Sequence, residues 1–244
     1  MSGPADLDAL ISYLNHNYAE SYRFLFEAKA GEAFFGATPE CLLALKGKGK
    51  ALSTMALAGT IRRSKDLAED DTLAQKLLAD PKERWEHELV IQQVTERLKP
   101  LSKSLEIPTT AIMKLPHIQH LYTPITAKLK KNYRLIELTK ELHPTPALGG
   151  APRYQALDYI AQAEPLPRGF YAAPLGYIEA NQQEGEMVVA IRSAVAQASR
   201  LWLFAGAGIV AGSEAEKEWQ ETALKFRVML QALEQTHASP IGRA

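Results

Sequence analysis

Two acidic segments, far apart in the sequence, carry the side chains best suited to chemistry. The first, residues 81–88, includes Glu86. The second includes Glu218, Glu221 and Lys225, whose spacings of three and four residues place them on one face of a helix. Carboxylates are the protein ligands that Mg²⁺ prefers, usually together with water and the oxygens of an anionic substrate. The two segments therefore predict that Glu86, Glu218 and Glu221 bind Mg²⁺ in an enzyme that acts on a small anion.

The first acidic segment is predicted to be a helix that turns Glu86 toward the interior. Asp80 can cap a helix, and Pro81 is well tolerated as its first residue. Apolar residues then follow Glu86 at every fourth position, namely Val90, Val94 and Leu98. This period is typical of the buried face of a helix. A carboxylate on that face needs a partner.

Both acidic segments have a second interpretation, as solvated helix faces. Charged runs are most often exposed, and Lys82 or Lys225 could pair with glutamates on its own helix. The two segments alone leave both interpretations open. The remainder of the sequence favours the metal site.

The composition describes a globular chain without net charge. With 244 residues, 46% of them hydrophobic, the chain can bury a substantial core. Lys plus Arg and Asp plus Glu both number 28, so no overall field attracts nucleic acid or an anionic membrane. The only cysteine is Cys41, which excludes a disulfide within the chain. The N-terminal residues lack a secretory signal pattern and no apolar run could span a bilayer, so we expect a cytoplasmic protein without nucleic-acid or membrane partners.

The periodicity predicts an α+β chain whose last third is a β-meander followed by a helix. A helix near residues 7–14 precedes a β-hairpin that turns at Gly31. Further helices are predicted over residues 66–79, from Pro81, over 133–141, over 152–163 and at the C-terminus; strands are predicted over 169–178, 187–195 and 201–210. No repeat or linker divides the chain, so we expect one domain over residues 1–244.

Eight blocks, read in order, carry a resemblance to a known family. They are Phe35–Glu40, Leu57–Thr60, Lys82–Val90, Leu142–Gly150, Arg168–Tyr171, Ala190–Ser193, Ala205–Val210 and Glu218–Lys225. Together they resemble the chorismate-utilising enzymes, and within them the isochorismate synthases of the menaquinone pathway. The resemblance runs from about Tyr22 onward, and an ordered set of blocks is more specific than any single motif.

Two of the blocks decide the position within the family. In aminodeoxychorismate synthases the residue before the Gly-Thr pair is typically a lysine that attacks the substrate, whereas this chain has Ala58 before Gly59 and Thr60. Anthranilate and salicylate synthases typically replace the His-Pro-Thr-Pro element, which this chain retains at residues 143–146. Isochorismate synthase is therefore the first expectation, with a salicylate or anthranilate synthase as the enzymatic alternative.

The resemblance implies two packed antiparallel β-sheets flanked by helices, with chorismate and Mg²⁺ bound in a deep cleft. The implied isomerisation adds water at one ring carbon while the hydroxyl at another leaves, which converts chorismate to isochorismate. Such chemistry needs a base for the water, an acid for the departing oxygen and a cation against the ring carboxylate. By its match to the family's Ser/Thr-Pro-Glu motif, Glu40 is the implied general acid, and apolar surroundings would raise its pKa.

The same matching implies the metal and substrate contacts. Glu86 and Glu221 would bind Mg²⁺ directly, and Glu218 directly or through water. Arg192 and Tyr171 would hold the enolpyruvyl carboxylate, since a guanidinium grips both oxygens of a carboxylate. The other residues implied to contact substrate are Gly59, Thr60, His143, Thr145, Ala147, Gly206, Gly208 and Lys225. His120 and His143 are weaker candidates, each of which could equally be a hydrogen-bonded core histidine.

The chain departs from the family at its beginning. In relatives the general base is a lysine on an early strand, roughly fifty residues before the motif that ends here in Glu40, and the only lysine before Glu40 is Lys29. We therefore expect a domain truncated at its N-terminus, with impaired synthase activity. Strands that are missing from the sheets would leave exposed edges and permit self-association. A catalytically inactive chorismate-binding module is the alternative outside catalysis.

Overall fold

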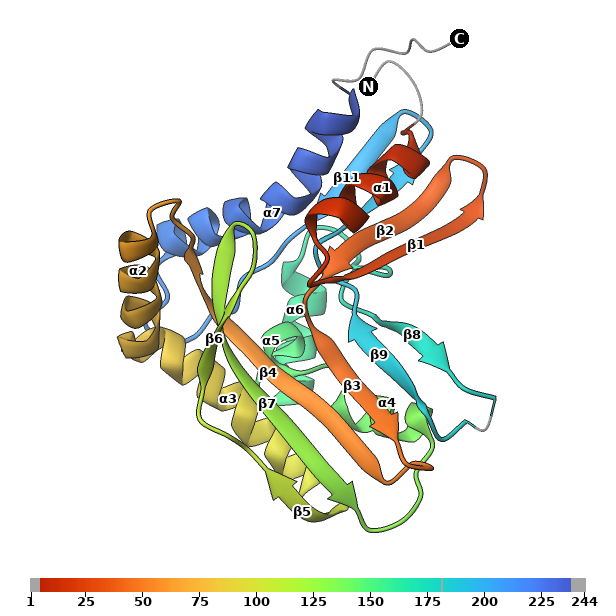
Figure 1. Cartoon of the computed structure of the whole chain (residues 1–244), viewed down its shortest axis with the longest axis vertical. Coiled ribbons are helices and arrows are strands. Elements are labelled where there is room, and N and C mark those ends of the chain that lie inside the picture. The colour runs from red at the N-terminus through yellow and green to blue at the C-terminus, as the bar shows by residue number, and fades with distance from the viewer. Residues whose placement is uncertain (1–4, 181, 238–244) are drawn as a thin grey trace.

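The fold is built on two antiparallel sheets, seen in a computed structural model that describes residues 5–180 and 182–237 (Figure 1). The smaller sheet has the strand order β1-β2-β10-β11. Its strands are β1 (Tyr22–Lys29), β2 (Glu32–Thr38), β10 (Ser193–Gln197) and β11 (Arg200–Phe204). Helices α1 (Leu7–Asn17) and α7 (Ala215–His237) pack on this sheet (Figure 1). Their shared core includes Leu10, Leu14, Phe35, Ala194 and Met229.

The larger sheet has the order β5-β7-β4-β3-β9-β8, and β6 also pairs with β7. Its strands are β3 (Cys41–Lys46), β4 (Ala51–Arg62), β5 (Ser102–Glu106), β6 (Ala111–Lys114), β7 (Ile118–Leu129), β8 (Pro174–Ile178) and β9 (Gly185–Val189). The helices between these strands are α2 (Leu67–Ala79), α3 (Pro81–Leu98), α4 (Leu135–Leu142), α5 (Pro146–Gly149) and α6 (Arg153–Ala163). The prediction of two antiparallel sheets flanked by helices is therefore confirmed.

Helix α3 forms as the sequence predicts. The Asp80 side chain accepts hydrogen bonds from the N–H groups of Lys82 (2.9 Å) and Glu83 (3.1 Å), and Pro81 is the first helical residue. The apolar stripe of Val90, Val94 and Leu98 lies in the core of the larger sheet. Because Glu86 belongs to the same stripe, its side chain is also buried.

The prediction of a C-terminal β-meander is wrong. The apolar run 187–195 divides into β9 of the larger sheet and β10 of the smaller sheet, with Arg192 between them at φ +53°. Strand β8 begins five residues later than predicted, at Pro174, and β11 ends at Phe204 instead of continuing to Val210. Periodicity could not reveal the change of sheet, because the residues on both sides of it are apolar and buried.

The segment around Arg192 crosses from one sheet to the other close to β2, because Gly36 of β2 has no side chain there. The Ala37 N–H donates to the Arg192 carbonyl oxygen at 3.1 Å. A Cβ atom on Gly36 would lie 2.5 Å from that oxygen and 2.9 Å from the Cα of Ser193. Both contacts are with backbone, which cannot move aside as a flexible side chain can. Gly36 thus fixes the backbone that presents Arg192.

Edge strands remain at the margins of both sheets. In β1, an edge of the smaller sheet, Leu25 and Phe26 are 38% and 52% exposed. Apolar residues on an open edge favour pairing with another chain, so self-association stays a prediction. Among the described residues, no helix has both the length and the apolar character needed to cross a bilayer.

Gly36→Ala is expected to lower the free energy of unfolding by about 1–3 kcal/mol, because the added methyl group overpacks the sheet crossing. Urea denaturation followed by circular dichroism measures the change. The control is Gly31→Asn, at a hairpin turn where a Cβ meets nothing within 4 Å and asparagine tolerates the positive φ. An unfolding free energy equal to that of the wild type in Gly36→Ala would contradict the proposed role of the glycine.

Candidate active site

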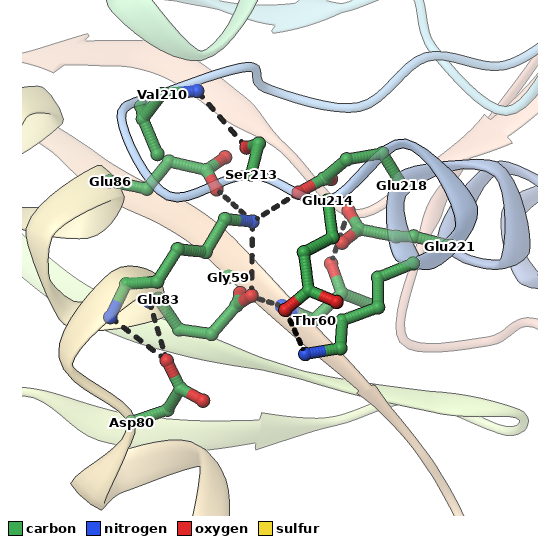
Figure 2. Close-up of polar contacts among 12 residues, drawn as sticks. Gly59, Thr60, Asp80, Glu83, Glu86, Val210, Ser213, Glu214, Glu218 and Glu221 are labelled. Carbon is green, nitrogen blue, oxygen red and sulfur yellow. Dashed lines mark hydrogen bonds and ion pairs between the residues drawn. The ribbon is translucent and has the colours of Figure 1, made fainter.

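Three carboxylates from two helices converge on one lysine. The Lys82 Nζ atom lies 2.8 Å from Glu218 Oε1, 3.1 Å from Glu83 Oε1 and 3.3 Å from Glu86 Oε2. Figure 2 shows Glu83 and Glu86 of α3 turned toward Glu218 of α7. These helices are more than a hundred residues apart in the sequence. The predicted metal site required that they lie side by side, and they do.

Burial and mutual repulsion shift the pKa values of the groups around Lys82. Burial raises the pKa of Glu86 to about 7, with Lys82 acting against this shift and the charges of Glu221 and Glu83 adding to it. Burial also raises the pKa of Glu83. Burial works to lower the pKa of Lys82, but Glu218, Glu86 and Glu83 outweigh it and raise that pKa. The Oε2 atom of Glu218 is buried without a hydrogen-bond partner. The site thus holds more negative charge than one lysine neutralises.

Glu221 belongs to the same site through a neighbouring ion pair. Its Oε1 atom lies 2.6 Å from Lys225 Nζ and accepts a hydrogen bond from Thr60 Oγ1 at 2.9 Å. The Thr60 N–H donates to Glu83 Oε2 at 3.0 Å, so Thr60 joins the acidic residues of the two helices (Figure 2). Glu86 and Glu218 therefore meet at Lys82, and Glu221 is linked to them through Thr60 and Glu83. In the side-chain positions described, no group of three or more His, Cys, Asp or Glu residues is arranged to hold a metal ion.

The structure agrees in part with each of the two interpretations of the acidic segments. The pairs Lys82–Glu86 and Lys225–Glu221 are contacts within one helix at i,i+4, as the solvated-face interpretation expects. These side chains are nevertheless 19% exposed or less, and Lys82 also reaches the other helix. The sequence reasoning missed Glu83, although its position one turn before Glu86 was a usable signal.

The glycine loop after β11 allows two polar side chains to approach closely. A Cβ atom on Gly208 would lie 2.3 Å from Glu86 Oε1, and one on Gly206 would lie 2.9 Å from Tyr171 Oη. The Tyr171 ring stacks on Phe204, with centroids 5.4 Å apart. The predicted role for these glycines was backbone contact with a ligand, and their local role is to leave space for Glu86 and Tyr171.

The guanidinium of Arg192 is buried beside His120. Its Nη2 atom lies 3.1 Å from His120 Nε2. Burial lowers the pKa of Arg192 to about 10, opposed by the charges of Glu221, Tyr171 and Glu40, so the side chain remains cationic at neutral pH. A buried cation of this kind suits recognition of a substrate carboxylate.

The predicted acid Glu40 is buried between the sheets. Burial raises its pKa to about 7, while Lys225, Thr145 and Arg192 act in the opposite direction. The Thr145 hydroxyl donates to Glu40 Oε1 at 3.5 Å. A carboxyl group with this pKa is partly protonated at neutral pH, as a general acid must be.

His143 and Ala147, the two other predicted substrate contacts in residues 143–147, have different surroundings. Ala147 packs against the core of the larger sheet. Burial and the charge of Arg153 lower the pKa of His143 to about 4, and its Nδ1 atom is buried without a hydrogen-bond partner among the described residues. The structure thus gives Thr145 a polar contact in the site and gives Ala147 a packing role.

Glu40→Gln is expected to weaken the dependence of stability on pH. The folded pKa of about 7 lies above the ordinary 4.5, so the stability associated with protonated Glu40 is fully present below pH 4.5 and is lost as pH rises through 7. Above this window the variant is expected to be more stable than the wild type by up to about 3 kcal/mol.

Denaturation in urea between pH 4 and pH 8 measures this difference. Glu86 titrates in the same window, and the comparison with wild type isolates the Glu40 contribution. The exposed Glu88, changed to Gln, serves as the control. Parallel stability curves for wild type and Glu40→Gln would show that Glu40 is not held in its protonated form.

Comparison with known proteins gives this fold and site a family. The family model described as "Chorismate binding enzyme" matches residues 1–234. The chain is 45% identical to a salicylate biosynthesis isochorismate synthase of Pseudomonas aeruginosa, over 92% of this chain and 46% of that protein. It is 38% identical to the isochorismate synthase MenF of Bacillus subtilis, over 95% of this chain and 48% of that protein.

Solved structures agree with the sequence comparisons. A putative 2,3-dihydroxybenzoate-specific isochorismate synthase, DhbC, of Bacillus anthracis superposes with a TM-score of 0.90 at 36% identity, covering 96% of this chain and 63% of that one. The menaquinone-specific isochorismate synthase MenF of Escherichia coli gives a TM-score of 0.85 at 34% identity, over 95% of this chain and 53% of that one.

The two antiparallel sheets flanked by helices are the fold of the solved isochorismate synthases that this chain resembles. The chain belongs to the family of chorismate-binding enzymes, and its solved and curated relatives include isochorismate synthases. The chain spans about half the length of the curated relatives it matches.

Proposed function

We propose that this polypeptide binds chorismate together with Mg²⁺ and supplies the acid and metal side of an isochorismate synthase. The observation that carries the proposal is the convergence of acidic residues from α3 and α7 next to buried Glu40 and Arg192. One region thus offers Arg192 for an anionic substrate, the acidic residues for a divalent cation, and Glu40 as the general acid. The likeness to MenF proteins makes the menaquinone pathway our narrower proposal.

The acidic cluster offers the carboxylate oxygens that a divalent cation such as Mg²⁺ prefers. Glu83, Glu86 and Glu218 already surround a cation, the Lys82 ammonium, and Glu218 Oε2 has a lone pair without a partner. We assign Glu86 and Glu221 as direct ligands and Glu218 as a direct or water-mediated one. When bound, Mg²⁺ supplies positive charge against the ring carboxylate.

Chorismate carries two carboxylates, and the proposal gives each one a cationic partner. Arg192 and Tyr171 hold the enolpyruvyl carboxylate, while Lys225 adds positive charge beside the metal. Gly59 and Thr60 line the ring. The Thr60 hydroxyl donates to Glu221 at 2.9 Å, which fixes the position of its side chain on β4. Protonated Glu40 donates its proton to the departing hydroxyl oxygen.

The lysine expected to activate water has no candidate in the first strands of this chain. Lys29, the only lysine before Glu40, lies at the end of β1, is 70% exposed and pairs with Glu32 at 3.1 Å. Loss of a general base lowers a rate by about 10²–10⁴-fold. We therefore propose that the 244-residue polypeptide, assayed by itself, binds chorismate and turns it over slowly.

Calorimetric titration of chorismate into the purified chain is expected to show binding that requires Mg²⁺, because the metal offsets repulsion between the acidic residues and the substrate. Chromatography of the products with and without ammonia then identifies the reaction. Isochorismate is the expected product. Salicylate or anthranilate would favour the alternative synthases, binding without any product would identify an inactive binding module, and absence of binding would contradict the proposal.

Lys82→Met is expected to increase the stabilisation that Mg²⁺ provides. Without the ammonium group the carboxylates repel one another in the absence of metal, and the metal no longer competes with a tethered cation. Thermal unfolding with and without MgCl₂ measures the shift in Tm, which we expect to exceed that of wild type by several degrees. Lys217→Met, which removes an exposed pair with Glu214, is the matched control. Equal shifts in Tm for all three proteins would place the cation elsewhere.

A further inference from the structure

His120 is a buried histidine whose hydrogen bonds define one tautomer. Its Nδ1 atom lies 3.0 Å from the carbonyl oxygen of Gly59, which can only accept, so Nδ1 carries the proton. Its Nε2 atom lies 3.1 Å from Arg192 Nη2, which can only donate, so Nε2 is the acceptor. The imidazole is therefore neutral and protonated at Nδ1. Both ring nitrogens are engaged by the protein and neither is left for a ligand.

A charged imidazole cannot satisfy the same contacts. A proton on Nε2 would face the N–H group of Arg192 at 3.1 Å. The surroundings favour the neutral form as well, because burial, with the charges of Arg192 and Lys225, lowers the pKa of His120 well below its ordinary value. The histidine accordingly keeps an acceptor aimed at Arg192 across the neutral pH range.

Thr60 connects His120 to Glu221 through hydrogen bonds. Thr60 Oγ1 lies 3.1 Å from His120 Nδ1 and gives its own proton to Glu221, so the threonine oxygen accepts a share of the Nδ1 proton. His120 and Thr60 face each other across the pairing of β7 with β4, beside a register shift between Ala58 and Thr60. The series Arg192, His120, Thr60, Glu221 thus joins the proposed carboxylate anchor to the proposed metal ligands.

We propose that His120 is a positioning residue, which orients the Arg192 guanidinium through Nε2 and the Gly59–Thr60 segment of β4 through Nδ1–H. It accepts one N–H of the planar guanidinium, so that the remaining N–H groups are directed to the substrate carboxylate. This inference rests on the proposed function for its ligand, while the hydrogen bonds themselves are a property of the protein alone. In this role His120 acts through Arg192 and Thr60 and does not itself contact the substrate.

Two amide variants separate the nitrogens of the ring. In His120→Gln the amide reaches the position of Nε2 and can accept from Arg192, whereas in His120→Asn it reaches only the position of Nδ1 and can donate to Gly59. Chorismate binding in the presence of Mg²⁺ is measured by calorimetry, and folding by thermal unfolding. We expect His120→Gln to bind within about 3-fold of wild type and His120→Asn to bind about 10-fold or more weakly, since a hydrogen bond to a charged group is lost.

Nitrogen NMR of the unmodified protein tests the inference without substrate. The chemical shifts of the two His120 ring nitrogens are expected to report protonated Nδ1 and unprotonated Nε2 from pH 6 to pH 8. The reverse tautomer, or equal losses of affinity in the two amide variants, would overturn the positioning role. If wild-type protein binds no chorismate, the proposed function fails, and the tautomer together with the exchange rate of the Arg192 side-chain N–H signals in each variant still decides the inference.

Discussion

Repulsion among buried carboxylates is the constraint on which this structure depends. Acidic side chains from α3 and α7 share one poorly solvated region, and like charges there are tolerable only around a cation. The Lys82 ammonium fills that place with contacts of 2.8–3.3 Å to three glutamates. The carboxylates here outnumber the lysine charges that could neutralise them, and such an arrangement contributes little to folding by itself. It is explained if the residues bind a divalent ion together with an anionic substrate.

The second requirement is that residues from both sheets reach the same site. The crossing from β9 to β10 places Arg192 between the sheets, and Gly36 of β2 leaves room for the Arg192 carbonyl. Strand β4 brings Thr60 from the larger sheet, where it bridges Glu83 and Glu221. The proposed anchoring, acid and metal functions thus depend on a few close backbone approaches, which explains why glycines recur at these positions.

The sequence predicted the features that depend on local rules, and it did not predict where the chain passes from one sheet to the other. The four-residue period after Glu86 correctly predicted a buried carboxylate, since burial of one helix face is a local property. The division of residues 187–195 between two sheets was not predictable, because an apolar run fits either sheet. Lys82 was seen only as a helical partner of acids on its own helix, and its contact with Glu218 depends on tertiary packing. The proposed roles of Glu40 and Arg192 come from the family resemblance, because no spacing rule predicts them.

The most direct test of the shared cation site uses Mn²⁺, which accepts the same oxygen ligands as Mg²⁺ and has an electron paramagnetic resonance signal when free. Titration of the wild-type chain is expected to remove the signal of about one equivalent of Mn²⁺ per chain. The Glu86→Gln, Glu221→Gln double variant should remove none at the same concentration, while a variant with exposed Glu88 and Glu214 changed to Gln should behave as wild type. Unchanged Mn²⁺ binding in the Glu86, Glu221 double variant would contradict the account that carboxylates of α3 and α7 hold one ion between them.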